Sequence, residues 1–214
     1  MIGIFGGTFD PVHYGHIKPA LFVKQVLNLS QLRFIPNRIP PHRETPWLSV
    51  EQRLSLLQSA LQDYPDVLVD QRELNRQGSS FMLDTLKSLH DDFPDETLCL
   101  IIGMDAFFGI TSWYQWTSLF DCCHLVVMTR PGFAQSQLEQ QVTMDDYRFL
   151  TEKMTTDVAA LTAEKSGRIL LQSVPQLDIS STQIRADLQN HVDISQCLPK
   201  QVYQQLKRLN LHDN

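Results

Sequence analysis

Short runs of apolar residues recur along the chain, separated by longer segments with helical periodicity. A strand made of continuous apolar residues is typical of a parallel sheet buried on both faces, and the helices between such strands form the crossovers. The pattern therefore predicts an α/β fold, in which an open parallel sheet is covered by helices on both faces. The apolar runs of strand length cover residues 2–5, 32–35, 67–69, 98–102, 125–128 and 169–174.

The segment from Ser49 to Leu61 shows the helical period most clearly. Ser49 and Gln52 have the spacing of a capping box, in which each side chain binds the other residue's backbone N–H. The apolar residues that follow are three or four positions apart, as on one face of a helix. They are Val50, Leu54, Leu57 and Leu61.

No repeat or low-complexity linker divides the chain. We therefore expect a single domain over residues 1–214, with a C-terminal helical part from about residue 180. Residues 143–166 are polar and of mixed charge, which indicates an exposed helix without catalytic groups.

Composition narrows the class of protein. The chain has 214 residues, 43% of them hydrophobic, and a formal net charge of −6, which argues against a nucleic-acid partner. No apolar stretch approaches the roughly 20 residues of a membrane span, so we expect a cytoplasmic protein without a membrane partner. The four cysteines lack a C-x-x-C spacing and are interpreted as buried thiols; they are Cys99, Cys122, Cys123 and Cys197.

Glycine, histidine and arginine gather where the predicted strands end. The segments that follow four of the strands are residues 6–16, 36–43, 103–105 and 129–132. In an open parallel sheet the carboxyl ends of the strands form the ligand crevice. The sequence thus predicts one site along this edge.

The first of these segments combines a glycine pair with two histidines. Gly6 and Gly7 let the backbone approach a ligand closely, because neither residue has a Cβ. His13 and His16 are three apart at the start of a helix predicted to run through Leu27, where free N–H groups and partial positive charge attract phosphate. The same field disfavours protonated imidazole, so both rings are predicted to be neutral donors. Two alternatives are half of a metal site and a simple helix cap.

A second helix beginning lies near the other end of the chain. Ser180 or Ser181 is suited to be its N-cap. Thr182 and Arg185 add a hydroxyl and a guanidinium within one turn, and these groups could converge on an anion. In isolation, the same residues also fit an ordinary capped helix.

The stretch GGTFDPVHYGH resembles the signature of the nucleotidylyltransferase superfamily, and its opening resembles the nicotinate mononucleotide adenylyltransferase branch. The resemblance implies a Rossmann-like, nucleotidylyltransferase-type sheet. It also implies that His13 and His16 contact the ATP phosphates and stabilise the transition state. The remaining ATP-binding residues that it implies are Gly6, Gly7, Thr8 and Phe9 and, from an ISSTxxR-like element, Ser180, Ser181, Thr182 and the catalytic Arg185.

Further stretches resemble the nicotinate mononucleotide branch. They are a PNxxPPH(K/R)-like loop, a GxD element and a WY pair. By this resemblance Asn37 contacts the mononucleotide, Arg43 an anionic group, Asp105 the ribose hydroxyls, and Trp113 the pyridine ring. The other residues assigned to this site are Gly103, Tyr114 and Arg130.

One position departs from the family pattern. Phe81-Met82 stands where the family often has Tyr-Thr, in a region implied to bind the pyridine carboxylate largely through backbone N–H groups. A backbone donor survives replacement of its side chain, so Phe81 and Met82 stay assigned to the mononucleotide site. The choice between the acid and amide forms of the substrate stays open.

The implied reaction transfers AMP from ATP to nicotinate mononucleotide, giving deamido-NAD and pyrophosphate in NAD biosynthesis. The implied partners are ATP and the mononucleotide, with Mg²⁺ carried on the phosphates and no metal site built by the protein. Alternatives are preference for the amide mononucleotide, another acceptor such as phosphopantetheine or glycerol phosphate, an aminoacyl-tRNA synthetase fragment, and a non-catalytic nucleotide sensor. The oligomeric state stays open.

Overall fold

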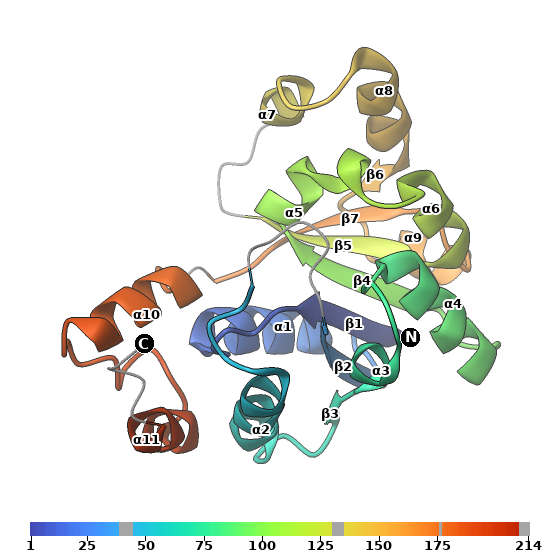
Figure 1. Cartoon of the computed structure of the whole chain (residues 1–214). Coiled ribbons are helices and arrows are strands. Elements are labelled where there is room, and N and C mark those ends of the chain that lie inside the picture. Colours follow the sequence, from blue (N-terminus) through green and yellow to red (C-terminus); the bar gives the residue numbers. More distant parts are fainter. Residues whose placement is uncertain (39–44, 130–134, 176, 210–214) are drawn as a thin grey trace.

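The computed structural model describes residues 1–38, 45–129, 135–175 and 177–209 (Figure 1). These residues form a seven-stranded parallel sheet in the order β3-β2-β1-β4-β5-β7-β6. All six predicted strands are present, and β6 is an additional short edge strand. The strands are β1 (Ile2–Gly7), β2 (Gln31–Pro36), β3 (Val67–Val69), β4 (Leu98–Gly103), β5 (His124–Thr129), β6 (Met154–Thr155) and β7 (Ile169–Ser173).

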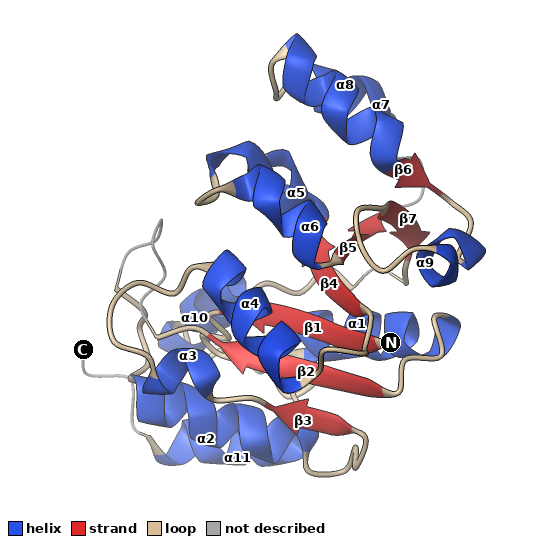
Figure 2. Cartoon of the chain, turned by 90° about the vertical axis from the view of Figure 1, so that its right-hand side faces the viewer, coloured by secondary structure: helices blue, strands red, loops and turns tan. Residues whose placement is uncertain are grey.

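Helices cover both faces of the sheet, as predicted (Figure 2). One hydrophobic cluster includes residues of α1 (Tyr14–Val26), α2 (Val50–Leu61), α9 (Ala159–Ala163), α10 (Ser181–Gln189) and α11 (Lys200–Arg208). A second cluster includes residues of α4 (Met82–Asp92), α5 (Met104–Phe108), η1 (Ile110–Ser112), η2 (Trp116–Ser118), α6 (Leu119–Cys122), α7 (Gln135–Glu139) and α8 (Met144–Lys153). The short α3 (Arg72–Asn75) lies between β3 and α4 in the chain.

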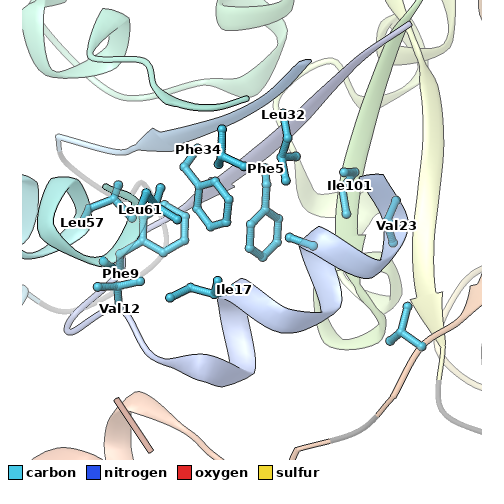
Figure 3. Packing of buried hydrophobic residues seen from close by; sticks show 14 of the residues in the cluster. Phe5, Phe9, Val12, Ile17, Val23, Leu32, Phe34, Leu57, Leu61 and Ile101 are labelled. Carbon is cyan, nitrogen blue, oxygen red and sulfur yellow. The ribbon is translucent and has the colours of Figure 1, made fainter. Parts of the chain in front are cut away.

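Aromatic side chains fill the space between α1 and the strands β1 and β2. Figure 3 shows Phe5, Phe9 and Phe34 close together, with Ile17 of α1 beside these rings. The rings of Phe5 and Phe34 meet edge to face, 5.3 Å between centroids, and those of Phe5 and Phe9 are 5.8 Å apart. Burial of each ring stabilises the fold by roughly 1.5–3 kcal/mol. This rigid layer supports the residues that follow β1.

The predicted capping box is confirmed, but the buried face of α2 differs from the apolar set in the sequence. Ser49 accepts a hydrogen bond from the backbone N–H of Gln52, and the Gln52 side chain accepts one from Ser49. Val50 and Leu54 are half-buried. The residues of α2 that turn fully inward are Arg53, Leu56, Leu57, Ala60 and Leu61.

The interpretation of residues 143–166 as an exposed helix is only partly right. Helix α8 is followed by β6, which pairs with β7, and then by α9. Leu150 and Leu161 are completely buried, one in each hydrophobic cluster. Other apolar side chains of this stretch are half-buried against the same clusters: Tyr147, Phe149, Met154 and Val158. Apolar residues scattered in a polar stretch give a weak periodic signal, so the sequence did not show this packing.

The interpretation of the cysteines as buried thiols holds for two of the four. All four are free; Cys99 and Cys123 are buried, whereas Cys122 and Cys197 are partly exposed. Burial raises the pKa of Cys99 to about 12 and that of Cys123 well above its ordinary value. Within the described residues, no helix has the length and apolar character needed to cross a membrane.

Candidate active site

The sheet opens at the carboxyl ends of β1 and β4. These neighbours pair only as far as Ile4 and Leu100, although each strand continues for three more residues. On its other side β1 stays paired with β2 through Gly7 and Pro36. The strand order also reverses between β1 and β4, and such switch points in parallel sheets form ligand crevices. The segments that follow β1 and β4 carry several of the predicted site residues, among them His13, His16 and Asp105.

The start of α1 brings the two histidines together. His13 is the N-cap residue and has no side-chain cap hydrogen bond. Its ring stacks on that of His16, with 3.8 Å between centroids. Phe9 contacts the other side of His16, edge to face at 5.3 Å. The two imidazoles are therefore held as one unit at the amino end of the helix.

Burial determines the charge of His13. The side chain is 3% exposed, and loss of solvation lowers its pKa from 6.5 to about 4. The ring is therefore neutral at pH 7, as predicted, with burial as the principal cause. Its buried Nδ1 has no hydrogen-bond partner among the described residues.

Phe9, which the resemblance places along the nucleotide site, has its side chain in the core. It is only 2% exposed. Its backbone has a φ of 52°, a left-handed conformation that few residues adopt. This turn directs the ring beneath the site, where it supports His16.

The two helix beginnings identified in the sequence meet in space. Gly15 lies so close to the segment before α10 that a Cβ there would come within 2.9 Å of the carbonyl oxygen of Ile179. The Ser181 hydroxyl donates to the carbonyl of Pro11 at 3.0 Å. Arg185 Nη1 donates to the carbonyl of Asp10 at 2.6 Å. The start of α10 is thereby fixed against the turn that precedes α1, as Figure 1 also shows.

The polar groups at the start of α10 have distinct partners. Ser180 is the N-cap, and its side chain accepts a hydrogen bond from the backbone N–H of Gln183. Arg185 Nη2 donates to the Thr182 hydroxyl at 3.3 Å. The predicted cap is thus Ser180, while Ser181 makes the tertiary contact.

Asp10 links several parts of the site, a role that the sequence did not reveal. Its two carboxylate oxygens accept hydrogen bonds from the backbone N–H groups of Leu48 and Trp47, at 2.9 and 2.8 Å. One oxygen also lies 3.5 Å from Arg185 Nη1. The only signal in the sequence is its place within the signature stretch.

The loop after β2 is bound to the loop after β1. The Asn37 side chain donates to the Thr8 hydroxyl at 3.3 Å, and its backbone N–H donates to the carbonyl of Gly7 at 3.0 Å. The Asn37 Oδ1 atom is buried and has no hydrogen-bond partner within the described part of the chain. It is therefore available to accept a hydrogen bond from a ligand.

The start of α4 lies beside these loops. A Cβ on Gly6 would come within 2.6 Å of the Met82 methyl group, so the glycine makes room for that side chain. Phe81 is the N-cap of α4 and has no side-chain cap hydrogen bond. Its ring stacks on that of Tyr114, which is 47% exposed, at 4.6 Å between centroids. An aromatic pair thus borders the amino end of α4.

Some of the remaining predicted residues follow β4, and two are outside the described part of the chain. Gly103 ends β4, and Asp105 is exposed in the first turn of α5. Trp113 is half-buried against the second hydrophobic cluster. Arg43 and Arg130 lie outside the described residues.

The site contains donors to anions rather than a set of metal ligands. Among the residues that the structure describes, no group of three or more His, Cys, Asp or Glu could hold a metal ion. Asp10 is the carboxylate beside Arg185, and its oxygens already accept hydrogen bonds from the backbone.

Comparisons with known proteins agree with this geometry. A family model described as cytidylyltransferase-like matches residues 4–187. A protein of Methylococcus capsulatus named "Probable nicotinate-nucleotide adenylyltransferase" is 42% identical over 213 residues, which cover 99% of each chain. A protein of Aeromonas hydrophila with the same name is 40% identical over 211 residues, covering 99% of this chain and 96% of that protein.

Solved structures show the same fold. The Plasmodium falciparum nicotinic acid mononucleotide adenylyltransferase complexed with NaAD matches with a TM-score of 0.70, covering 99% of this chain and 97% of that chain. At 18% sequence identity, this likeness concerns the arrangement of the sheet and helices.

Proposed function

Because the chain belongs to the nicotinate-nucleotide adenylyltransferases of the cytidylyltransferase-like family, we propose that it transfers the AMP part of ATP to nicotinate mononucleotide. The products are deamido-NAD and pyrophosphate, in the biosynthesis of NAD. The observation that carries the proposal is the meeting of two helix beginnings from opposite ends of the chain at one opening of the sheet.

The ATP phosphates bind between these helix beginnings. His13 and His16 donate to the phosphates from α1, while Ser181, Thr182 and Arg185 bind the β- and γ-phosphates from α10. Amino ends of helices attract anions through their N–H groups and partial positive charge. Gly6 and Gly7 allow the nucleotide to approach the end of β1, and Thr8 adds a hydroxyl. Ser180 contributes by capping α10.

The reaction needs positioning and charge stabilisation but no general base. The phosphate of the mononucleotide has a second pKa near ~6 and is largely ionised at neutral pH. One of its oxygens attacks the α-phosphorus of ATP in line, and the bond to the bridging oxygen of the β-phosphate breaks. Pyrophosphate leaves with the negative charge, which His16 and Arg185 stabilise. The neutral His13 adds a donor that burial holds in a fixed place.

We also propose that Mg²⁺ enters with ATP as the co-substrate complex. A site of guanidinium, hydroxyl and imidazole groups fits a metal bound mainly by phosphates and water. When bound, the ion neutralises part of the phosphate charge. Arg185 and Thr182 then hold the phosphates that carry it.

The mononucleotide binds on the other side of the crevice. By resemblance Phe81 and Met82 bind the pyridine carboxylate at the start of α4, where no side chain caps the helix. The backbone N–H of Phe81 donates to the Ser79 carbonyl at 3.2 Å, so the backbone N–H of Met82 is the principal donor in this proposal. Trp113 stacks on the pyridine ring beside Tyr114. Asp105, after Gly103, binds the ribose hydroxyls, and Asn37 accepts a hydrogen bond through its buried Oδ1. Arg43 and Arg130 stay assigned to the same substrate by resemblance alone.

The test measures pyrophosphate release and dinucleotide formation with ATP, Mg²⁺ and three acceptors in parallel. These are nicotinate mononucleotide, its amide and phosphopantetheine. We expect the highest kcat/KM with the acid, because the uncapped helix end interacts more strongly with a carboxylate than with a neutral amide. Equal or higher kcat/KM with either other acceptor would overturn the proposal.

A further inference from the structure

Arg53 is a charged residue in the interior beneath the crevice. It lies on the inward face of α2 with four apolar neighbours and is 1% exposed. A residue at this position that served only the core would be apolar, since a buried charge contributes little net stability. The arginine at this position is therefore best explained by the groups that it binds.

Among the described residues, the hydrogen-bond partners of Arg53 lie in the loops that follow β1 and β2, and its Nε atom has no partner there. Its Nη1 atom donates to the carbonyl of Thr8 at 2.8 Å and to that of Asn37 at 2.9 Å. Its Nη2 atom donates to the carbonyl of Arg38 at 3.4 Å. One planar guanidinium thus joins a loop on the ATP side to a loop on the mononucleotide side, in the fixed geometry of its donors.

The loop after β2 accepts two of the three hydrogen bonds of the guanidinium, at the carbonyls of Asn37 and Arg38. Arg38 has further contacts with Ser80 and Arg76, whereas the other hydrogen bonds of Asn37 go to Gly7 and Thr8 of the loop after β1. Removing the guanidinium would therefore leave Asn37 attached only to the neighbouring loop, and we expect its position to change.

We propose that Arg53 is a positioning residue that sets the place of Asn37 and so determines the affinity for the mononucleotide. The inference rests on the proposed function, because it assumes the mononucleotide binds beside Asn37. Arg53 touches neither substrate and acts through the backbone of the two loops. Burial lowers the pKa of Arg53, and the nearby Asp10 carboxylate opposes the shift.

The test compares Arg53→Met and Arg53→Lys with the unchanged protein. In Arg53→Met we expect the KM for nicotinate mononucleotide to rise about tenfold or more, since small displacements of positioning groups have large effects. The KM for ATP should rise less than threefold. In Arg53→Lys, whose ammonium group can serve the Thr8 and Asn37 carbonyls but lacks the fork, the mononucleotide KM should lie between the two values.

Arg33→Met is the matched control. Arg33 is also largely buried and pairs with Asp70, but it lies in the middle of β2, away from the crevice. We expect a lower melting temperature with both KM values unchanged. Kinetics are measured well below the melting temperature of each variant.

The proposal is overturned if Arg53→Lys keeps the mononucleotide KM of the unchanged protein, or if both KM values rise equally in either variant. Should Arg53→Met not fold, Arg53→Lys decides the question by the same ratio. Failure of the proposed function is distinguishable, since the unchanged protein would then lack activity with nicotinate mononucleotide. Direct titration of the mononucleotide by calorimetry measures the same loss of affinity without turnover.

Discussion

The beginnings of α1 and α10 meet at one crevice but are built differently. The start of α1 has a buried N-cap residue, His13, no side-chain cap, and two stacked imidazoles beside an aromatic layer. The start of α10 is more exposed, is capped by Ser180 and presents hydroxyl and guanidinium groups. Burial keeps His13 neutral and ring stacking holds His16 against it, whereas Arg185 carries a permanent charge.

The two helix beginnings are therefore suited to different phosphates of ATP. The fixed imidazole donors of α1, of which His13 is neutral, are suited to the α-phosphate, where the bond changes occur, because preorganised groups stabilise a transition state without reorganisation. A cationic side chain with a longer reach is suited to the phosphates that leave. Four substitutions test whether the two helix beginnings differ in this way.

Replacing His16 should have the largest effect. In His16→Ala we expect kcat/KM to fall by about thirty- to a thousandfold, through loss of about 2–4 kcal/mol of transition-state stabilisation. Steady-state release of pyrophosphate measures it. His90→Ala, which changes an exposed histidine of α4, is the control and should leave the rate unchanged. A folded His16→Ala protein with undiminished turnover would remove His16 from the mechanism.

The buried His13 should make stability depend on pH. The unfolded chain binds a proton near pH 6.5, but the folded protein does so only near pH 4. The free energy of unfolding is therefore unaffected by protonation of His13 above pH 6.5. It decreases as the pH falls from 6.5 toward 4, by up to roughly 3 kcal/mol. Burial also lowers the pKa of His124, which adds a loss of the same sign.

Urea unfolding at several pH values between 7.5 and 4 measures this dependence. In His13→Gln the slope should become shallower, while Arg185→Ala should leave it unchanged. An unaltered slope in His13→Gln would show that the ring is not held neutral by the fold.

Replacing Arg185 should act mainly on ATP. A hydrogen bond from a charged group contributes about 1.5–3 kcal/mol, so Arg185→Ala should raise the KM for ATP by about ten- to a hundredfold. The KM for the mononucleotide should change little. The control is Arg168→Ala, which removes an arginine paired with Glu164. Unchanged ATP kinetics in Arg185→Ala would contradict its place at the triphosphate.

The smallest effect is expected at the cap of α10. Ser180→Ala should lower the free energy of unfolding by about 1 kcal/mol, and Ser180→Gly by only a few tenths. Thr143→Ala removes the equivalent cap of α8, and its loss of stability should be similar, with no change in the KM for ATP. Chemical denaturation measures all three. Equal stability of Ser180→Ala and the unchanged protein would mean that the cap is replaced by water.

Local patterns in the sequence were sufficient to predict six of the strands and the two helix beginnings. Apolar runs and helical periods predicted the parallel sheet, and the capping box at Ser49 formed as expected. Both helix beginnings were found because cap residues, glycines and phosphate donors lie within a few positions of each other. These features are local, so a short stretch of chain is sufficient to specify them.

The way in which these elements pack together depends on contacts between distant parts of the chain. The contact between Arg185 and Asp10 joins residues far apart in the chain, and no local pattern predicts it. Phe9 entered the core because a left-handed turn directs its ring inward. The sequence does not distinguish Arg53, because a charged residue on a helix is ordinarily exposed. Its burial depends on carbonyl groups in the loops that follow β1 and β2, which only the folded sheet brings together. Periodicity fixes which face of a helix is apolar, but the packing of the sheet fixes which polar side chain finds its partners inside.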